Sequence, residues 1–80
     1  MPIPGDIQAA KIVRREITRR PIDYSRIDIR VNHGIVYIRG QVAAMRGQPL
    51  DIREEMQLIV KVIRQRPGIR DVILDVIYRT

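Results

Sequence analysis

The segment from Ile27 to Val42 limits the possible folds more than any other part of the chain. It reads IDIRVNHGIVYIRGQV, two runs in which apolar and polar residues alternate on either side of Asn32-His33-Gly34. Glycine adopts a positive φ without a Cβ clash, as a tight hairpin turn requires. The segment therefore predicts a β-hairpin with strands near 25–31 and 35–42. One face of this hairpin carries the apolar residues Ile27, Ile29, Val31, Val36, Ile38 and Val42.

A helical pattern precedes the hairpin. Asp6 is a good N-cap whose charge also suits the positive end of a helix. After it, apolar residues recur at helical spacing, namely Ile7, Ala10, Val13 and Ile17, with Ile12 beside them. Glu16 can pair with Arg20 four residues later, and Pro21 ends the helix. Residues 1–5 contain Pro2, Pro4 and Gly5 and are expected to form an extended tail.

A second helix and a last strand follow the hairpin. After a loop from Ala43 to Leu50, Asp51 caps a helix that Pro67-Gly68 ends. Its apolar stripe is Ile52, Met56, Ile59, Val60 and Ile63. The final strand, Ile69 to Tyr78, places Val72, Leu74, Val76 and Tyr78 on one face. The order α-β-β-α-β predicts an α+β fold, a two-layer sandwich with two helices packed on one face of a three-stranded sheet. Residues 6–80 are expected to form one domain.

The other face of the predicted sheet carries apolar residues as well. If the last strand lies beside the second, Ile35, Tyr37, Ile73 and Ile77 form one exposed apolar patch, rimmed by Arg39, Asp75 and Arg79. Patches of this kind mark contact surfaces, although scattered apolar residues are also common on protein surfaces. The predicted interaction face therefore comprises Ile35, Tyr37, Arg39, Ile73, Ile77 and Arg79.

The chain is strongly basic, with a net charge of +6 that attracts polyanions or acidic protein surfaces. The candidate anion-binding residues lie at the two helix ends: Arg14, Arg15, Arg19, Arg20, Arg64, Arg66 and Arg70. They make nucleic-acid binding the main alternative to a protein contact. The only aromatic residues are Tyr24, Tyr37 and Tyr78, too few for a base-stacking platform, and of these Tyr37 alone is expected to face outward from the sheet.

Catalytic patterns are nearly absent, so the chain is not expected to be an enzyme. The single histidine, His33, lies in the hairpin turn, and Ser25 has no basic partner nearby in the sequence. Asp51 and Glu55 share a helix face, where acidic residues most often complement the helix dipole. There is no cysteine and no Gly-rich phosphate loop. No metal or other cofactor is expected.

The chain also lacks the features of a secretory signal and of a membrane-spanning run. We therefore expect a cytoplasmic protein for the chain as given. If the chain is part of a longer exported protein, we expect it to be associated with the cell envelope.

Two segments resemble the BON domain family, named for bacterial osmotic-stress and nodulation proteins. The family's hairpin pattern is similar to Gly34, Val36, Ile38, Gly40 and Val42 here. Its turn into the final strand is similar to Pro67, Gly68, Ile69 and Val72. The resemblance spans residues 6–78. It implies a non-enzymatic adhesion or docking module, linked in that family to phospholipid surfaces and to attachment within larger assemblies.

The leading functional hypothesis is a binding or assembly module whose outer sheet face contacts a protein partner or a second copy of the chain. An anionic phospholipid surface is a further candidate partner, because each arginine near such a surface contributes about 1 kcal/mol. Nucleic acid, bound through the arginine clusters at the helix ends, is the alternative.

Overall fold

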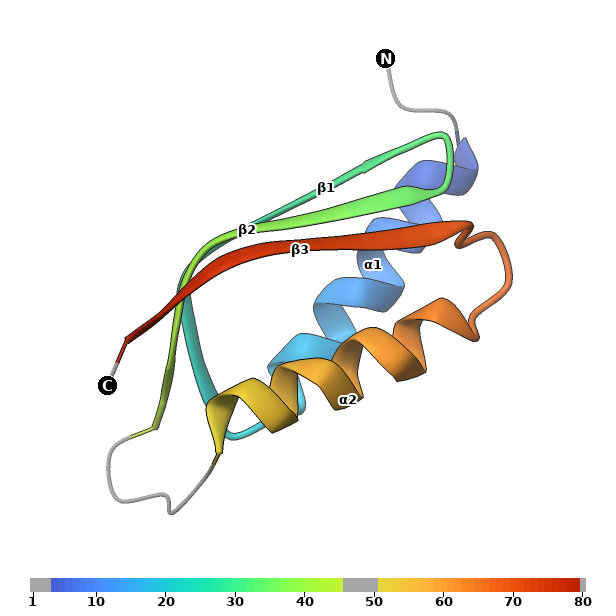
Figure 1. The fold of residues 1–80 in the computed structure, drawn as a ribbon. Helices are drawn as coiled ribbons and strands as arrows, with labels where there is room; N and C mark the ends of the chain where they lie inside the picture. The colour runs from blue at the N-terminus through green and yellow to red at the C-terminus, as the bar shows by residue number, and fades with distance from the viewer. Residues whose placement is uncertain (1–3, 46–50, 80) are drawn as a thin grey trace.

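The computed structural model describes residues 4–45 and 51–79. Its elements are α1 (Pro4–Thr18), β1 (Ile22–Asn32), β2 (Ile35–Ala44), α2 (Ile52–Arg64) and β3 (Asp71–Arg79). The strands form one sheet in the order β1-β2-β3, with β2 antiparallel to β1 and parallel to β3. Both helices lie on the same face of this sheet and run in opposite directions (Figure 1). The predicted α+β fold, with two helices against a three-stranded sheet, is confirmed.

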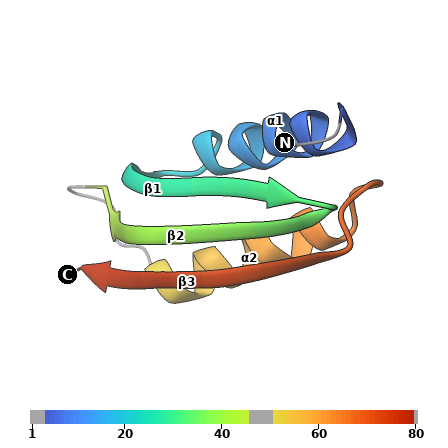
Figure 2. The ribbon, with the colours of Figure 1, turned by 90° about the horizontal axis from the view of Figure 1, so that it is seen from above.

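The helical layer is wider than the sheet. Two packed helices lie about 8–10 Å apart and are each about 10 Å across. Three strands at about 4.8 Å spacing are narrower than such a layer. As a result, α2 lies beneath β2 and β3, whereas α1 projects beyond the free edge of β1 (Figure 2). The inner side chains of β1, namely Ile27, Ile29 and Val31, are for this reason only half-buried.

The hairpin turn is held by the first turn of α1. His33 and Gly34 both adopt a positive φ, of 52° and 79°. Their backbone amides therefore point to the same side, and both donate to the carboxylate of Asp6, at 2.9 Å from His33 and 2.8 Å from Gly34. Asp6 is 3% exposed. The prediction of Asp6 as an N-cap is wrong, because α1 begins at Pro4 and Asp6 lies within its first turn.

This contact sets the orientation of α1 about its own axis. With Asp6 turned toward the hairpin, the buried face of α1 consists of Asp6, Ala9, Val13, Glu16 and Ile17. The predicted apolar stripe is therefore partly wrong. Ile7 is 50% exposed, and Ala10 and Ile12 are only half-buried. A buried carboxylate with two amide donors outweighs the burial of one isoleucine, since bonds to charged groups contribute about 1.5–3 kcal/mol each.

The second helix follows its prediction closely. Asp51 accepts from the amides of Arg53 and Glu54, at 3.1 and 3.3 Å, and caps the N-terminus. Its predicted stripe packs inward, with Ile52 half-buried at the margin. Tyr78 also lies on this side of the sheet, where the guanidinium of Arg53 stacks 4.5 Å from its ring centre. The fully buried core side chains are Val13, Ile17, Ile22, Val36, Ile38, Val42, Met56, Ile59 and Ile63.

The start of β1 and the end of β2, which lie away from the hairpin turn, bend toward the helical layer (Figure 1). The β1–β2 register shifts between Asp23 and Arg26, as in a β-bulge. Just beyond this shift, Gly40 pairs with Ile27 at a φ of 118°. A Cβ at Gly40 would collide with the carbonyl oxygen of Arg26. Glycine is thus required here by both conformation and space.

Several predicted boundaries differ from the observed ones. Pro4 and Gly5 belong to α1 rather than to an extended tail, as proline is tolerated in a first helical turn. β1 begins at Ile22 instead of near residue 25, β2 continues to Ala44, and β3 begins at Asp71. Of the predicted loop from Ala43 to Leu50, residues 46–50 lie outside the described residues, as do residues 1–3 of the tail.

Replacing Asp6 with alanine tests the contact between α1 and the hairpin. The Asp6→Ala variant leaves the buried amide of Gly34 and the part-buried amide of His33 without their acceptor, so its free energy of unfolding should fall by about 3 kcal/mol. Asp28→Ala, which removes an exposed carboxylate paired with Arg30, should lower it by less than about 1 kcal/mol. Urea denaturation followed by circular dichroism measures both. Equal losses would contradict the assigned role of Asp6.

Replacing Gly40 with alanine tests the close approach of β1 and β2. We expect Gly40→Ala to lower the free energy of unfolding by about 2–3 kcal/mol, because it adds both a clash and a strained φ. Gly5→Ala is the matched control. A Cβ there meets nothing within 4 Å, and alanine favours the helix by about 0.5 kcal/mol. In thermal unfolding, Gly40→Ala should lower the melting temperature and Gly5→Ala should raise it slightly. An unchanged melting temperature for Gly40→Ala would refute the steric argument.

Candidate interaction surfaces

The outer face of the sheet is left uncovered by either helix (Figure 1). Because side chains alternate along a strand, the register assigns its residues to cross-strand rows. From the hairpin end, the rows over β1, β2 and β3 are Asn32-Ile35-Asp71, Arg30-Tyr37-Ile73, Asp28-Arg39-Asp75, Arg26-Gln41-Ile77 and Asp23-Ala43-Arg79. All six residues of the predicted interaction face lie on it, on β2 and β3.

The predicted apolar patch is divided rather than continuous. Tyr37 and Ile73 are direct cross-strand partners, and Ile35 lies beside them in the next row. The following row is charged, with Arg39 Nε 3.6 Å from an Asp75 carboxylate oxygen. Ile77 lies beyond that row, next to Gln41, and is 65% exposed. The prediction of one patch rimmed by these charges is therefore wrong, because the row of Arg39 and Asp75 separates Ile77 from the other apolar residues.

The charges on this face balance. Its rows contain four arginines, Arg26, Arg30, Arg39 and Arg79, and four aspartates, Asp23, Asp28, Asp71 and Asp75. Several are paired with each other, with Arg30 3.0 Å from Asp28 and Arg79 3.5 Å from Asp23 across the small side chain of Ala43. Among the described residues, the charges of these rows thus cancel, and the excess of positive charge lies on other surfaces.

Asp23 is further held by the residue two positions later. The hydroxyl and the backbone amide of Ser25 donate to its carboxylate, at 2.6 and 3.0 Å. These hydrogen bonds hold the pKa of the Asp23 carboxyl below its ordinary value, and the bond from the Ser25 hydroxyl has the larger effect. The hydroxyl of Ser25 is therefore used in a local hydrogen bond, at the point where the β1–β2 register shifts.

The predicted anion-binding arginines do not form one site. Arg14, Arg15, Arg19 and Arg20 lie along the C-terminal half of α1 and just beyond it, near the N-terminus of α2. Arg64, Arg66 and Arg70 lie at the end of α2 and in the turn that follows. Because the helices run in opposite directions, these two clusters lie at opposite ends of the helical layer (Figure 1).

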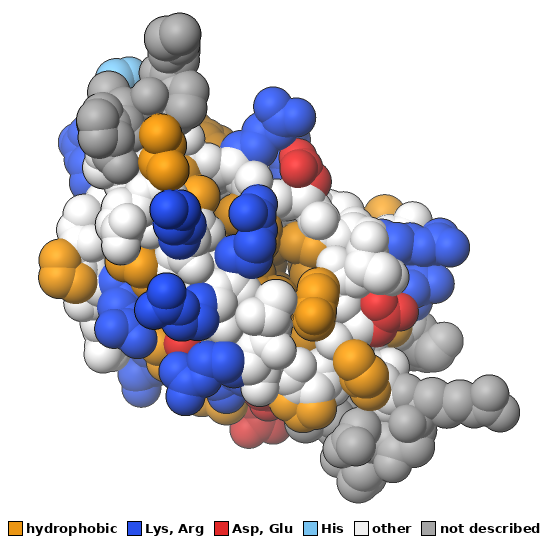
Figure 3. All heavy atoms as spheres, turned by 180° about the vertical axis from the view of Figure 1, so that it is seen from behind, with side chains coloured by type: hydrophobic (Ala, Val, Ile, Leu, Met, Phe, Trp, Pro, Cys, Tyr) orange, Lys and Arg blue, Asp and Glu red, His pale blue; other side chains and the backbone are white. Residues whose placement is uncertain are grey.

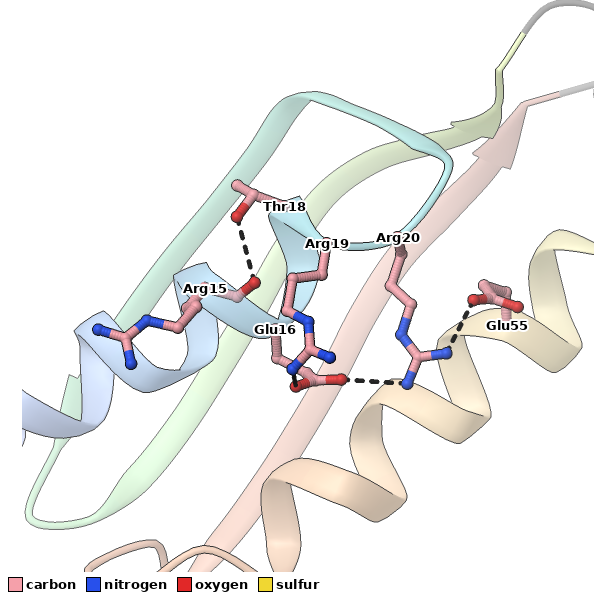
Figure 4. Close-up of polar contacts among 6 residues, drawn as sticks. All are labelled: Arg15, Glu16, Thr18, Arg19, Arg20 and Glu55. Atoms are coloured by element: carbon pink, nitrogen blue, oxygen red, sulfur yellow. Dashed lines mark hydrogen bonds and ion pairs between the residues drawn. The ribbon is translucent and has the colours of Figure 1, made fainter.

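Arg20 links the two helices (Figure 4). Its guanidinium donates to Glu16 at 3.0 Å, the predicted pair, and to Glu55 at 3.1 Å. Burial lowers the pKa of Arg20, but the hydrogen bonds to Glu16 and Glu55 outweigh that effect and raise it. Arg19 also contacts Glu16, at 3.6 Å, with 67% of its side chain exposed. Arg20 is thereby part of the α1–α2 interface.

The α2 cluster is also partly engaged. Arg64 lies 3.4 Å from the carboxylate of Asp71 and donates to the carbonyl of Val72. The stem of Arg70 lies against the hairpin turn, and its amide donates to the carbonyl of Gly34 at 2.8 Å. Arg66 is exposed.

Within residues 4–45 and 51–79 there is no cluster of three or more histidine, cysteine or acidic residues that could hold a metal ion. His33 is exposed, and its backbone amide binds Asp6. No helix in this described part of the chain is both long and apolar enough to cross a membrane.

Comparison with protein-family models, with curated proteins and with solved structures finds no match to this chain.

Sequence reasoning gave Asp6 a different role and did not single out Lys11 or Arg30 as candidate site residues. Asp6 binds a turn 27 residues away, and only the paired positive φ angles of His33 and Gly34 reveal why. Lys11 and Arg30 border the seam between α1 and β1 together with Arg14. The spacing of Lys11 and Arg14 signals a shared helix face, but the overhang of α1 that brings this face to β1 depends on the packing of the two helices.

Replacing Arg20 tests whether it stabilises the fold. Arg20→Met leaves Glu16 and Glu55 without their shared cation, and we expect the free energy of unfolding to fall by about 2 kcal/mol. Arg19→Met, with the same loss of charge, should change it by less than about 0.5 kcal/mol because Arg19 is exposed. Chemical denaturation of both variants measures the difference. A neutral effect of Arg20→Met would return Arg20 to the candidate anion-binding residues.

Proposed function

We propose that this chain is a non-enzymatic assembly module that binds a second copy of itself through the outer face of its sheet. The observation that carries the proposal is the charge neutrality of this face in a chain of net charge +6. Two copies repel each other over most of their surfaces, whereas the outer faces can meet without net repulsion. The resemblance to the BON family implies the same kind of role, as a docking module.

The apolar content of the outer face supports the same proposal. Ile73 is 43% exposed and Ile77 is 65% exposed, and Tyr37 lies beside Ile73. Exposed apolar side chains on an uncovered sheet gain about 25 cal/mol for each Å² that a partner removes from water. In a two-fold symmetric contact the same face serves both copies, so each apolar row gains a partner.

The size of the face determines the expected affinity. A strand of nine residues spans about 30 Å, and three strands cover a width of roughly 10–15 Å. The contact area is then a few hundred Å² per copy, below the roughly 800 Å² of a stable interface. We therefore expect a weak, concentration-dependent dimer.

Nucleic-acid binding through the helix-end arginines is less well supported. Arg20 is engaged by two carboxylates, and Arg64 by Asp71. The two clusters also lie at opposite ends of the helical layer, so one phosphate backbone would contact only one of them.

A charge introduced at Ile73 tests the proposed dimer contact. We expect Ile73→Glu to weaken self-association at least about tenfold, because two carboxylates would be desolvated at one interface. Leu58→Glu is the matched control, since Leu58 on α2 is 44% exposed and Ile73 is 43% exposed. Sedimentation equilibrium over a concentration series measures both variants, with circular dichroism to verify folding.

If Ile73→Glu fails to fold, Ile77→Glu provides the same test at a more exposed position. A wild-type chain that remains monomeric at millimolar concentration would refute the proposal. Equal effects of Ile73→Glu and Leu58→Glu would also refute it.

A further inference from the structure

A groove runs along the seam between α1 and the free edge of β1. It consists of two hollows of about 750 and 200 Å³, and Arg14 lines both. Residues that line the first hollow include Ile7, Lys11 and Arg14 of α1 and Arg30, Tyr37 and Arg39 of the sheet. The second is lined by Arg14, Ile17, Thr18, Tyr24, Ile27, Asp28 and Ile29. The first hollow lies beside the N-terminal half of α1 and the end of β1, and the second lies beside the C-terminal end of α1 and the earlier part of β1.

The groove has an apolar floor. The inner side chains of β1, Ile27, Ile29 and Val31, are half-buried, because α1 overhangs the strand without closing on it (Figure 2). Ile7 of α1 is 50% exposed at one end, and Tyr24 is 40% exposed at the other. An occupant of this groove would therefore bury apolar surface.

The border of the groove is cationic. Lys11 and Arg14 are exposed, and neither has an ion pair among the residues that the structure describes. Arg30 and Arg39 lie on the sheet side of the first hollow. Figure 3 views the face formed by α1 and β1 and shows lysine and arginine side chains gathered there, with hydrophobic side chains between them.

The carboxylates along the groove already have partners. Asp6 accepts from the hairpin turn amides, and Asp28 lies 3.0 Å from Arg30. Neither neutralises Lys11 or Arg14. Arg30 and Arg39 are paired with aspartates of the sheet, so the unpaired positive charge of the groove comes from Lys11 and Arg14 on α1.

The edge of β1 supplies a backbone template. β1 ends the sheet on one side, so alternate residues direct their N–H and C=O groups away from β2. A strand added at such an edge gains main-chain hydrogen bonds, and the neighbouring groove receives every second side chain.

We infer that this groove binds an extended, acidic peptide segment that adds to the sheet as a fourth strand beside β1. Its inward side chains are apolar and cover Ile27, Ile29 and Val31. Its outward carboxylates lie near Arg30 and are attracted by Lys11 and Arg14 at the border of the groove. The stretch of α1 from Ile7 to Thr18 is about 16 Å long, which accommodates about five extended residues. This inference does not rest on the proposed dimer, although Arg30, Tyr37 and Arg39 line the first hollow and also belong to the outer sheet face.

The observations favour a peptide over a nucleic acid. A phosphate backbone would be attracted to the same cations, but it offers no groups in register with the strand edge. It would also leave the apolar floor uncovered, and each hollow has a single aromatic side chain in its lining, Tyr37 in the first and Tyr24 in the second. An acidic strand satisfies the charge, the apolar floor and the backbone groups together.

Fluorescence anisotropy with a labelled peptide of about eight alternating valine and glutamate residues tests the inference. The full chain should bind this peptide, and a valine–lysine peptide of equal length should not bind. The double variant Lys11→Glu with Arg14→Glu should weaken binding at least about tenfold, since two attractive contacts become repulsive. The control is Lys61→Glu with Arg66→Glu, an equal change of charge at exposed positions in and just after α2, which should have a much smaller effect.

Two further probes separate strand addition from charge attraction alone. In an added strand, only every second N–H group points toward β1. Of two peptides N-methylated at the odd or at the even positions, one therefore loses these hydrogen bonds and should no longer bind, whereas the other should still bind. Equal weakening by both double variants, insensitivity to both methylation patterns, or no binding by the wild-type chain would overturn the inference. Displacement of the peptide by single-stranded RNA at equal charge concentration would assign the groove to nucleic acid instead.

Discussion

The carboxylate of Asp6 holds together three parts of the chain that are distant in sequence. It binds the amides of His33 and Gly34, and so attaches the start of α1 to the hairpin turn. The carbonyl of Gly34 in turn accepts from the amide of Arg70, which leads into β3. The space around Gly34 is correspondingly small, since a Cβ there would lie 2.9 Å from the carbonyl oxygen of Gly68. The first helix, the hairpin and the last strand are all positioned at this one turn.

Much of the fold could be predicted because its signals are local. The hairpin follows from alternation around Gly34, and α2 follows from its cap at Asp51 and its inward stripe. The orientation of α1 could not be predicted, because it depends on a bond between residues 27 positions apart. Apolar spacing alone placed Ile7 in the core, whereas the buried carboxylate of Asp6 turns Ile7 outward.

The candidate surfaces show the same division between local and long-range information. Parity along the strands correctly placed Tyr37, Ile73 and Ile77 on the outer face. The charged row that separates Ile77 from the others requires the β2–β3 register, which sets Arg39 beside Asp75. Likewise, the sequence indicates one partner for Arg20, Glu16, and only the packing of α1 against α2 reveals the second, Glu55.

The separation of charge between the two sides of the molecule follows from its architecture. A three-stranded sheet under two helices leaves one sheet face open and one helix projecting past the sheet edge. On the open face, pairs of arginine and aspartate, one within β1 and two between strands, cancel their charges. At the overhanging helix, Lys11 and Arg14 lie beside a half-buried strand. The fold thus presents a charge-balanced sheet face, which we propose binds a second copy, and a groove with a cationic border, which we infer binds an acidic peptide.

A dilution series of amide ¹H–¹⁵N spectra tests the central claim, self-assembly through the outer face, most directly. The account predicts concentration-dependent shifts for the amides of β2 and β3, with those of α2 unchanged. Spectra that do not change with concentration, or shifts concentrated on α2, would contradict it.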